Sequence, residues 1–334
     1  MRRLVFHGSR RLAVEEAIPA VLAPGEVRVR IHSVGVCGSD IHGYAGVNAR
    51  RQPGMVMGHE AVGLVAELGP DVSGPAVGTT VAINPIVSCG ECDYCRDGVE
   101  NVCERRRIYG CVPGLPGAYA DSIVVLAGNA VPLQGPAPIE WGALAEPLSV
   151  GARGARVGDV GRGEEVLVVG GGPIGVAAAL ACRRRGAGRV VVSELLAHRR
   201  EIAERLGFET LDPSSEKPPR SAFAKSIECV GHAATINAAL EAVRPRGTMV
   251  FVGLAEETVE LHPTPLMVGE RVIRGSSAYA MDDFRGVVSW VGSGDVDLAP
   301  LIELRVGLEG LPDVFERYAD GTLEAMKTLL QLAS

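Results

Sequence analysis

A glycine-rich loop between an apolar strand and a helix constrains the fold of this 334-residue chain more than any other feature. The loop reads GGGPIG, has the spacing G-x-G-x-x-G, and directly follows the run Val166–Val169. In such a loop the first glycine permits a tight turn, the second lets the backbone approach a pyrophosphate, and the third lets the helix pack closely on the strand. The pattern predicts a dinucleotide site at the helix N-terminus. The residues predicted to line this site are Gly170, Gly172, Pro173, Ile174 and Gly175.

Strands and helices alternate around and after this loop. Apolar strands are predicted at EEVLVVG, RVVVSE, SIECVG and TMVFVGL, and helices at GVAAALACRRRG, at about 198–206 and at TINAALEAVR. This alternation is typical of a parallel sheet with helices on both faces. We therefore expect residues 148–275 to form an α/β domain.

The rest of the chain has a different texture. Short runs rich in β-branched residues, punctuated by Gly and Pro, predict strands at Glu26–Val34, Ala61–Leu68 and Thr80–Val87. After residue 274, two helical stretches are predicted, at roughly 281–291 and 311–332. We expect a β-rich region before residue 146 and a helical C-terminal end.

Glu194 ends the strand that follows the nucleotide loop. A carboxylate at this position can accept hydrogen bonds from both hydroxyls of a ribose and would repel a 2′-phosphate. The chain is therefore expected to prefer NAD over NADP. Arg199 and Arg200 lie close by in the sequence and weaken that preference, because they could neutralise such a phosphate.

Four cysteines, Cys89, Cys92, Cys95 and Cys103, lie in a segment with few apolar side chains. Their spacing, C-x2-C-x2-C-x7-C, fits a closed tetrahedral Zn²⁺ site made of four thiolates. Because residues 84–111 have little core of their own, a structural zinc is expected to hold this lobe in shape. An iron–sulfur cluster is the alternative, although the fourth spacing is longer than in the usual bacterial run.

A second metal site, with an open coordination position, is predicted from residues upstream. Cys37 in GVCGSDIH and His59 in VMGHEAVG offer a thiolate and an imidazole, and a catalytic zinc usually has three protein ligands. Either Glu60 or Glu146 could be the third ligand, or the two could alternate. Asp40 could hydrogen-bond the far nitrogen of His59 and fix its tautomer.

Two further polar residues follow Cys37. Ser39 and His42 lie two and five residues beyond it, where they could pass a proton outward. The remaining cysteines match no ligand pattern and are expected to be ordinary buried thiols. They are Cys111, Cys182 and Cys229.

Charge and hydropathy exclude several classes of partner. The 33 basic and 40 acidic residues give a net charge of −7, whereas nucleic-acid binding needs a basic footprint. No run is long and apolar enough to favour a membrane helix, and no export signal opens the chain. The eight cysteines are therefore expected to stay reduced, in the cytoplasm.

Together these motifs resemble the zinc-dependent medium-chain alcohol dehydrogenases, especially the sorbitol, polyol and butanediol dehydrogenase branch. The matching segments are CGSDIH, GHEAVG, the four-cysteine lobe, EPLSV and the glycine loop, and the resemblance covers nearly the whole chain. It implies a GroES-like catalytic domain, residues 1–147 and 276–334, interrupted by a Rossmann NAD-binding domain, residues 148–275. It also implies an active site between the domains, and homodimers or homotetramers joined through Rossmann sheet edges.

The resemblance implies roles for individual residues. Cys37, His59 and Glu60 match the catalytic zinc ligands, and Glu146 matches a nearby carboxylate that often reaches the metal through water. Ser39 matches the hydroxyl that contacts the reacting oxygen, and His42 matches the outer end of the proton relay. The structural zinc ligands are matched by Cys89, Cys92, Cys95 and Cys103.

Two tyrosines match positions near the substrate, Tyr44 and Tyr279. Sorbitol dehydrogenases tend to carry an Arg-Tyr pair where this chain has Ala278-Tyr279, so the arginine that would grip a polyol is absent. The pocket is therefore expected to take a smaller or less hydroxylated alcohol than sorbitol.

The implied reaction is reversible NAD-dependent oxidation of a secondary alcohol, such as a diol, polyol or cyclitol, to a ketone, with Zn²⁺ as Lewis acid. Two alternatives stay open. One is a zinc-free quinone or enoyl reductase of the same fold, whose members generally lack the Cys and His-Glu ligands. The other is a non-enzymatic NAD-binding or zinc-binding scaffold. Two zinc ions per chain would favour the enzyme, one a scaffold or an empty site, and none the reductase.

Overall fold

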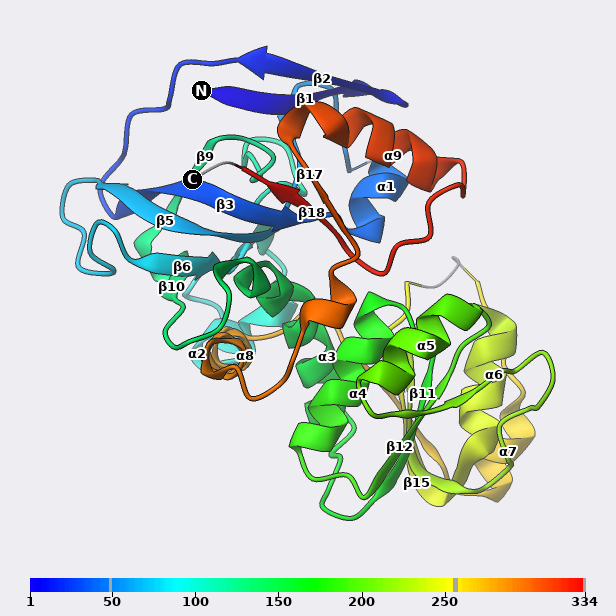
Figure 1. Cartoon of the computed structure of the whole chain (residues 1–334). Helices are drawn as coiled ribbons and strands as arrows, with labels where there is room; N and C mark the ends of the chain where they lie inside the picture. The colour runs from blue at the N-terminus through cyan, green and yellow to red at the C-terminus, as the bar shows by residue number, and fades with distance from the viewer. Residues whose placement is uncertain (48–49, 255–257, 333–334) are drawn as a thin grey trace. The chain divides into compact units, whose positions relative to one another are not determined.

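The computed structural model describes residues 1–47, 50–254 and 258–332, which form two compact units (Figure 1). One unit contains residues 1–146 and 280–334, and the other contains residues 147–279. Residues 333 and 334, the end of the predicted catalytic domain, lie outside the described residues. The chain passes from the first unit into the second near the start of helix α3 (Ala145–Val157).

The unit of residues 147–279 is built on a parallel sheet in the order β13-β12-β11-β14-β15-β16. Two of its inner strands, β11 and β12, are nearly continuous apolar runs, as is usual where helices cover both faces of a parallel sheet. This confirms the predicted α/β class. The strands are β11 (Glu165–Val169), β12 (Arg189–Ser193), β13 (Glu209–Leu211), β14 (Phe223–Glu228), β15 (Val243–Phe251) and β16 (Val272–Gly275).

The strand order reverses at β11, because later strands are added on both sides of it. Helix α4 (Pro173–Arg184) packs on β11 and β12, α5 (Ala197–Arg205) packs on β13, and α6 (Ala233–Ala242) packs on β14 and β15. The short helix α7 (Pro263–Val268) precedes the edge strand β16. The loops that follow β11, β12 and β14 consequently meet at the carboxyl edge of the sheet, where ligands of such folds bind.

The other unit is β-rich, and its central strand is β3 (Glu26–Gly35). Val27, Val29 and Ile31 alternate inward along this strand and are buried in the core. β3 pairs antiparallel with β5 (Glu60–Leu68), and the main sheet runs β10-β6-β5-β3-β18-β17, with β9 also on β3. The remaining strands of this sheet are β6 (Thr80–Ile83), β9 (Ser122–Leu126), β10 (Ala130–Pro132), β17 (Leu304–Val306) and β18 (Thr328–Gln331).

A smaller sheet and several helices complete this unit. The smaller sheet runs β2-β1-β4, with β1 at Arg2–Gly8, β2 at Arg11–Glu16 and β4 at Met55–Val56. Helix α1 (Gly38–Tyr44) packs on α9 (Leu311–Ala319), and α8 (Met281–Ser293) packs on the 3-10 helix η3 (Ile139–Leu144). Within the described residues, no helix has the length and apolar character needed to cross a membrane.

Two predicted elements are wrong in part. The helix predicted at 311–332 ends at Ala319, because Gly321 has a left-handed φ of 68°, and the chain then returns as strand β18. The strand predicted at Thr80–Val87 is broken into β6 and β7 (Ile86–Val87), because the Asn84 side chain accepts a hydrogen bond from the Ile86 N–H. The wrongly predicted helix matters more than the broken strand, because the residue directly before β18 belongs to the candidate metal centre.

Candidate metal centres and nucleotide site

The ladder between β3 and β5 brings Cys37 next to His59 and Glu60. Gly35, at the end of β3, pairs with Glu60 at the start of β5, and Cys37 follows two residues later as the N-cap of α1. The Cys37 sulfur, one ring nitrogen of His59 and one carboxylate oxygen of Glu60 all lie within 4.8 Å of one another. Strand pairing thus brings Cys37 next to two consecutive donors that lie more than 20 residues further along the sequence.

Two glycines make room for this arrangement. A Cβ atom at Gly35 would overlap Oε2 of Glu60, so only glycine leaves space for that carboxylate. Gly58 has a φ of 94°, and the ring of Tyr119 occupies the place where its side chain would lie. The side chains packed against these glycines therefore fix the backbone that carries His59 and Glu60.

His59 is oriented by a buried acid. Its Nδ1 lies 3.4 Å from Oδ2 of Asp40, which leaves Nε2 as the nitrogen that can meet a metal. Asp40 also accepts hydrogen bonds from Arg51 (2.7 Å) and the Tyr119 hydroxyl (3.1 Å). Burial opposes charge on the imidazole, but the thiol of Cys111 and the carboxylate of Asp40 outweigh it and raise the pKa of His59 well above its usual value.

The chemistry of these donors fits a catalytic zinc. A thiolate, an imidazole and a carboxylate are all ligands that Zn²⁺ accepts, and three protein ligands leave one position for a substrate. Nδ1 of His59 is buried, and its contact with the Asp40 carboxylate orients the ring.

The other predicted residues lie around this group. Ser39 donates a hydrogen bond to the Cys37 sulfur over 3.4 Å, and His42 lies exposed on the same helix, α1. Glu146 lies in the first turn of α3 and is not among the three grouped donors. It is close enough to Lys327 to contribute to that residue's electrostatics.

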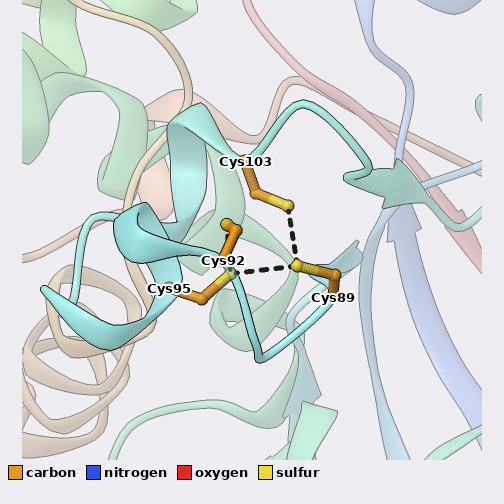
Figure 2. Close-up of side chains that lie close together, drawn as sticks. All are labelled: Cys89, Cys92, Cys95 and Cys103. Carbon is orange, nitrogen blue, oxygen red and sulfur yellow. Dashed lines mark hydrogen bonds between the residues drawn. The ribbon is translucent and has the colours of Figure 1, made fainter.

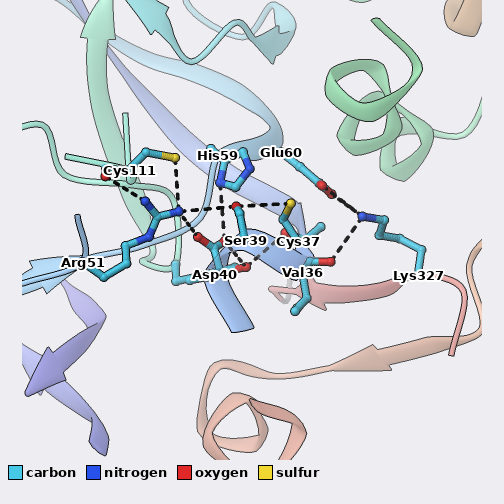
Figure 3. Close-up of polar contacts among 11 residues, drawn as sticks. Val36, Cys37, Ser39, Asp40, Arg51, His59, Glu60, Cys111 and Lys327 are labelled. Carbon is cyan, nitrogen blue, oxygen red and sulfur yellow. Dashed lines mark hydrogen bonds and ion pairs between the residues drawn. The ribbon is translucent and has the colours of Figure 1, made fainter. Parts of the chain in front are cut away.

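Two buried cations that the sequence analysis did not select lie on opposite sides of the Cys37, His59 and Glu60 group (Figure 3). Lys327 donates to both carboxylate oxygens of Glu60, and Arg51 donates to Asp40. A lone lysine in the apolar run MKTLLQL is the one signal that could have pointed to Lys327. Arg51 stands in a polar segment without any pattern that marks it.

Cys111 was expected to be an ordinary buried thiol, and this is wrong. Its side chain is half-buried, and its sulfur accepts a hydrogen bond from Arg51 over 3.3 Å. The Arg51 guanidinium also donates to the Cys111 carbonyl over 2.7 Å, which fixes this segment beside His59.

The four-cysteine lobe gathers its sulfurs into one cluster (Figure 2). The Sγ atoms of Cys92 and Cys95 are 3.5 Å apart, those of Cys89 and Cys103 are 3.5 Å apart, and those of Cys89 and Cys95 are 3.8 Å apart. Zn–S bonds of about 2.3 Å at tetrahedral angles give S–S separations of about 3.8 Å. The cluster therefore has the size of a zinc tetrahedron, and its cysteines form no disulfide.

The surroundings of this cluster favour the ionisation of one cysteine. Without a bound cation they oppose the ionisation of the others. Backbone N–H groups of Glu91 and Cys92 lower the pKa of Cys89 to about 6. The N–H of Cys95 acts the same way on Cys92, but burial and the neighbouring thiols together raise the pKa of Cys92 to about 12. A divalent metal would remove this conflict by stabilising all four thiolates.

The glycine loop adopts the geometry that a dinucleotide site needs. Gly170 has a φ of 95°, and a Cβ at Gly175 would overlap the Gly170 carbonyl, so both positions require glycine. A Cβ at Gly172 would meet Nη1 of Arg199 at 3.5 Å, which is an ordinary contact distance. Pro173 and Ile174 then form the first turn of α4.

Glu194 lies at the end of β12, beside this loop. Its Oε2 accepts from the Gly171 N–H at 2.7 Å and its Oε1 from the Leu196 N–H at 2.8 Å, which fixes the carboxylate. A cavity of about 940 Å³ opens next to it. Residues lining this cavity include Gly170, Glu194, Leu195, Arg199, Val230 and His232.

The two predicted substrate residues are both buried. The Tyr44 hydroxyl donates to Glu316, and its ring packs edge-on against Phe315 with the ring centroids 5.5 Å apart. Tyr279 is fully buried. Their roles toward a substrate stay predictions.

Comparison with known families matches both parts of the chain. Residues 23–135 match the alcohol dehydrogenase GroES-like domain, and residues 173–293 match the zinc-binding dehydrogenase family. The first match lies in the β-rich unit, and most of the second lies in the α/β unit.

Individual relatives extend over nearly the whole chain. Sorbitol dehydrogenase of Macaca fascicularis is 35% identical, covering 95% of this chain and 92% of the relative. L-idonate 5-dehydrogenase of Vitis vinifera is 33% identical, over 97% and 93%. A protein of Sinorhizobium meliloti 1021, solved bound to NADP, has a TM-score of 0.91 at 26% identity, with 99% of both chains covered.

Proposed function

This chain belongs to the zinc-containing medium-chain alcohol dehydrogenase family, and from that premise we propose that it oxidises a secondary alcohol to a ketone, reversibly, with NAD. The observation that carries the proposal is the group of Cys37, His59 and Glu60, whose donor atoms lie within 4.8 Å of one another. A zinc-free reductase of the same fold would have no use for these three donors together.

In the proposed reaction the alcohol loses a hydride and a proton and becomes a ketone. When bound at Cys37, His59 and Glu60, zinc would polarise the hydroxyl and lower its pKa, and a nicotinamide in the glycine-loop site would serve as the hydride acceptor. Ser39, whose Oγ lies beside the Cys37 sulfur at 3.4 Å, accepts the hydroxyl proton and releases its own hydroxyl proton toward His42. His42, exposed on the same helix, passes the proton to solvent.

The structure of the nucleotide site supports NAD as the coenzyme. Two backbone N–H groups fix the Glu194 carboxylate, which can still accept from ribose hydroxyls with its remaining lone pairs. Its negative charge disfavours a 2′-phosphate. Arg199 opposes this preference, because its guanidinium lies beside Gly172. A kcat/KM ratio in favour of NADP would contradict the role given to Glu194.

We propose a substrate that is smaller or carries fewer hydroxyls than sorbitol. Ala278, where an arginine would grip a polyol chain, offers no donor for several hydroxyls. Simple secondary alcohols and vicinal diols are therefore expected to give higher kcat/KM values than hexitols.

We further propose that the protein is a homodimer or homotetramer, joined through the sheet edge at β16. In the single chain this strand is exposed along its length, and Met267 and Val268, at the end of the preceding helix α7, are each 73% exposed. An apolar edge of this kind normally pairs with another chain. Light scattering that gives the mass of one chain would contradict this assembly.

The test is a screen of secondary alcohols, diols, polyols and aminocyclitols with NAD, followed at 340 nm. The wild-type protein, with two zinc ions per chain, is expected to reduce NAD. Cys37→Ser should abolish activity, and Ser39→Ala should lower kcat by about a hundredfold or more. Cys182→Ala, which alters a buried thiol in the α/β unit, is the matched control and should retain activity. Equal activity in Cys37→Ser would contradict the proposal.

A further inference from the structure

A fully buried acid, Glu228, ends strand β14 at the carboxyl edge of the parallel sheet. Its Oε1 accepts hydrogen bonds from the Val230 N–H at 2.9 Å and from the Gly231 N–H at 2.8 Å. The Thr235 hydroxyl lies 2.8 Å from the same oxygen and 2.8 Å from the His232 carbonyl, and its one proton can be donated to either. Glu228 therefore holds the turn between β14 and α6 in one conformation.

The other carboxylate oxygen of Glu228 makes no such contact. Oε2 is buried and has no hydrogen-bond partner in the part of the chain that the structure describes. A buried oxygen without a partner does not stabilise the fold, so what this side chain contributes comes from the contacts of Oε1. A neutral amide oxygen in the place of Oε1 could make the same contacts.

The turn that Glu228 holds forms part of the cavity of about 940 Å³ in the α/β unit. Val230 and His232 line this cavity together with Gly170 of the nucleotide loop. A Cβ at Gly170 would lie 2.6 Å from Cγ2 of Val230, so Val230 packs directly against the first glycine of that loop. A shift of the turn would therefore change both a wall of the cavity and the contact with the loop.

The strand that carries Glu228 does not depend on its side chain. β14 pairs with β11 on one side and with β15 on the other. The main-chain carbonyl of Glu228 also accepts hydrogen bonds from the N–H groups of Val252 and Gly253. Replacing the side chain should therefore release the turn and leave the sheet in place.

We propose that Glu228 is a positioning residue for the dinucleotide and that it acts as a hydrogen-bond acceptor, not through its charge. It holds Val230 and His232 in the positions that meet the coenzyme, so that this wall is ordered before the coenzyme binds. This inference rests on the proposed function, because it assumes a dinucleotide in this cavity.

Two variants separate the acceptor from the charge, and fluorescence titration with NADH gives the dissociation constant of each. Glu228→Gln keeps an oxygen at the Oε1 position, so NADH should bind within about threefold of the wild-type affinity. Glu228→Met has a similar length but leaves the two turn N–H groups unpaired, so NADH should bind at least about tenfold more weakly. Binding within threefold in Glu228→Met, or a tenfold loss in Glu228→Gln, would overturn the proposal. The second outcome decides even if Glu228→Met does not fold.

Glu209 of β13 offers a matched control in the same sheet. Its carboxylate is exposed, pairs with Arg189 and does not line the cavity. Glu209→Gln and Glu209→Met should both bind NADH within about twofold of wild type, since an exposed ion pair contributes little.

Steady-state kinetics separate positioning from general damage to the fold. In Glu228→Met the KM for NAD should rise at least about tenfold, whereas kcat at saturating NAD stays within about threefold, because Cys37, His59 and Glu60 lie in the other unit. A kcat that falls as much as KM rises would overturn the positioning role.

Amide hydrogen exchange in the coenzyme-free protein tests the turn itself. The Val230 and Gly231 amides should exchange at least about tenfold faster in Glu228→Met than in wild type, and should stay protected in Glu228→Gln. Equal exchange rates in wild type and Glu228→Met would overturn the proposal.

The NADH titration also distinguishes the two levels of inference. A wild-type protein that binds neither NADH nor NADPH would contradict the proposed function itself. A wild-type protein that binds NADH, with unchanged affinity in Glu228→Met, would contradict only the role of Glu228.

Discussion

Arg51 shows how one residue outside the metal-binding motifs supports the candidate centre. Its guanidinium contacts Asp40 at 2.7 Å, and the side chains of the two residues are 2% and 0% exposed. Burial would raise the pKa of Asp40, but the neighbouring His59 and Arg51 outweigh it and keep the pKa below its usual value. Asp40 therefore stays ionised and can orient the His59 ring, and Arg51 provides part of the charge that makes this possible.

Removing Arg51 should be costly because it leaves Asp40 as a buried, poorly compensated charge. We expect Arg51→Met to lower the free energy of unfolding by about 3–5 kcal/mol. The double variant Arg51→Met/Asp40→Asn removes both charges and should recover more than half of that loss. Both tryptophans, Trp141 and Trp290, lie in the β-rich unit, so their fluorescence during denaturation reports on this unit. Equal losses in the single and double variants would contradict the assignment.

At the level of elements, the C-terminal strands determine where Lys327 lies. β18 pairs antiparallel with β3 and parallel with β17, and Lys327 directly precedes β18. The run MKTLLQL suits both a helix and a strand, and only the strands that it pairs with decide between them. Hydropathy alone therefore led to the wrong prediction of a helix here. A helix would not bring Lys327 to the end of β3, so the wrong prediction left Lys327 out of the candidate site.

Glu140 of η3 joins these strands to the rest of the β-rich unit. It accepts hydrogen bonds from Arg305 of β17 at 2.6 Å and from Gln331 of β18 at 3.2 Å. The hydrogen bond from Arg305 is the main reason that the pKa of Glu140 is lowered from its ordinary value of 4.5. The ionised carboxylate therefore stabilises the folded state.

This interaction predicts a pH-dependent effect of Glu140→Gln. Because the folded pKa is depressed, the stabilisation is complete above about pH 4.5 and is lost as the pH falls through the lower folded value. At pH 7 we expect a loss of about 0.5–1 kcal/mol, since Arg305 is 40% exposed and solvent screens the pair. The difference from wild type in urea denaturation should shrink below pH 4.5. Arg305→Gln should show the same trend, and a difference that grows with acidity in either variant would contradict this account.

For the whole molecule, features that lie within one short segment were predicted from the sequence, whereas contacts between distant segments were not. The glycine loop, the alternation around it and the four-cysteine spacing each lie within a short segment, and their geometry follows from the residues themselves. Lys327 and Arg51 depend on pairing between distant segments, which periodicity cannot reveal. The choice between Glu60 and Glu146 stayed open for the same reason, because it depends on which carboxylate the β3–β5 ladder brings to Cys37.

The central claim is that this chain carries a second zinc, held by Cys37 and His59 and assisted by Glu60. Anomalous scattering at the zinc edge, from crystals of the zinc-loaded protein, tests it most directly. The account predicts two zinc peaks per chain, one among the four cysteines and one about 2.3 Å from the Cys37 sulfur and about 2.0 Å from a His59 nitrogen. A single peak in the four-cysteine lobe, or a second peak bonded to neither Cys37 nor His59, would contradict it.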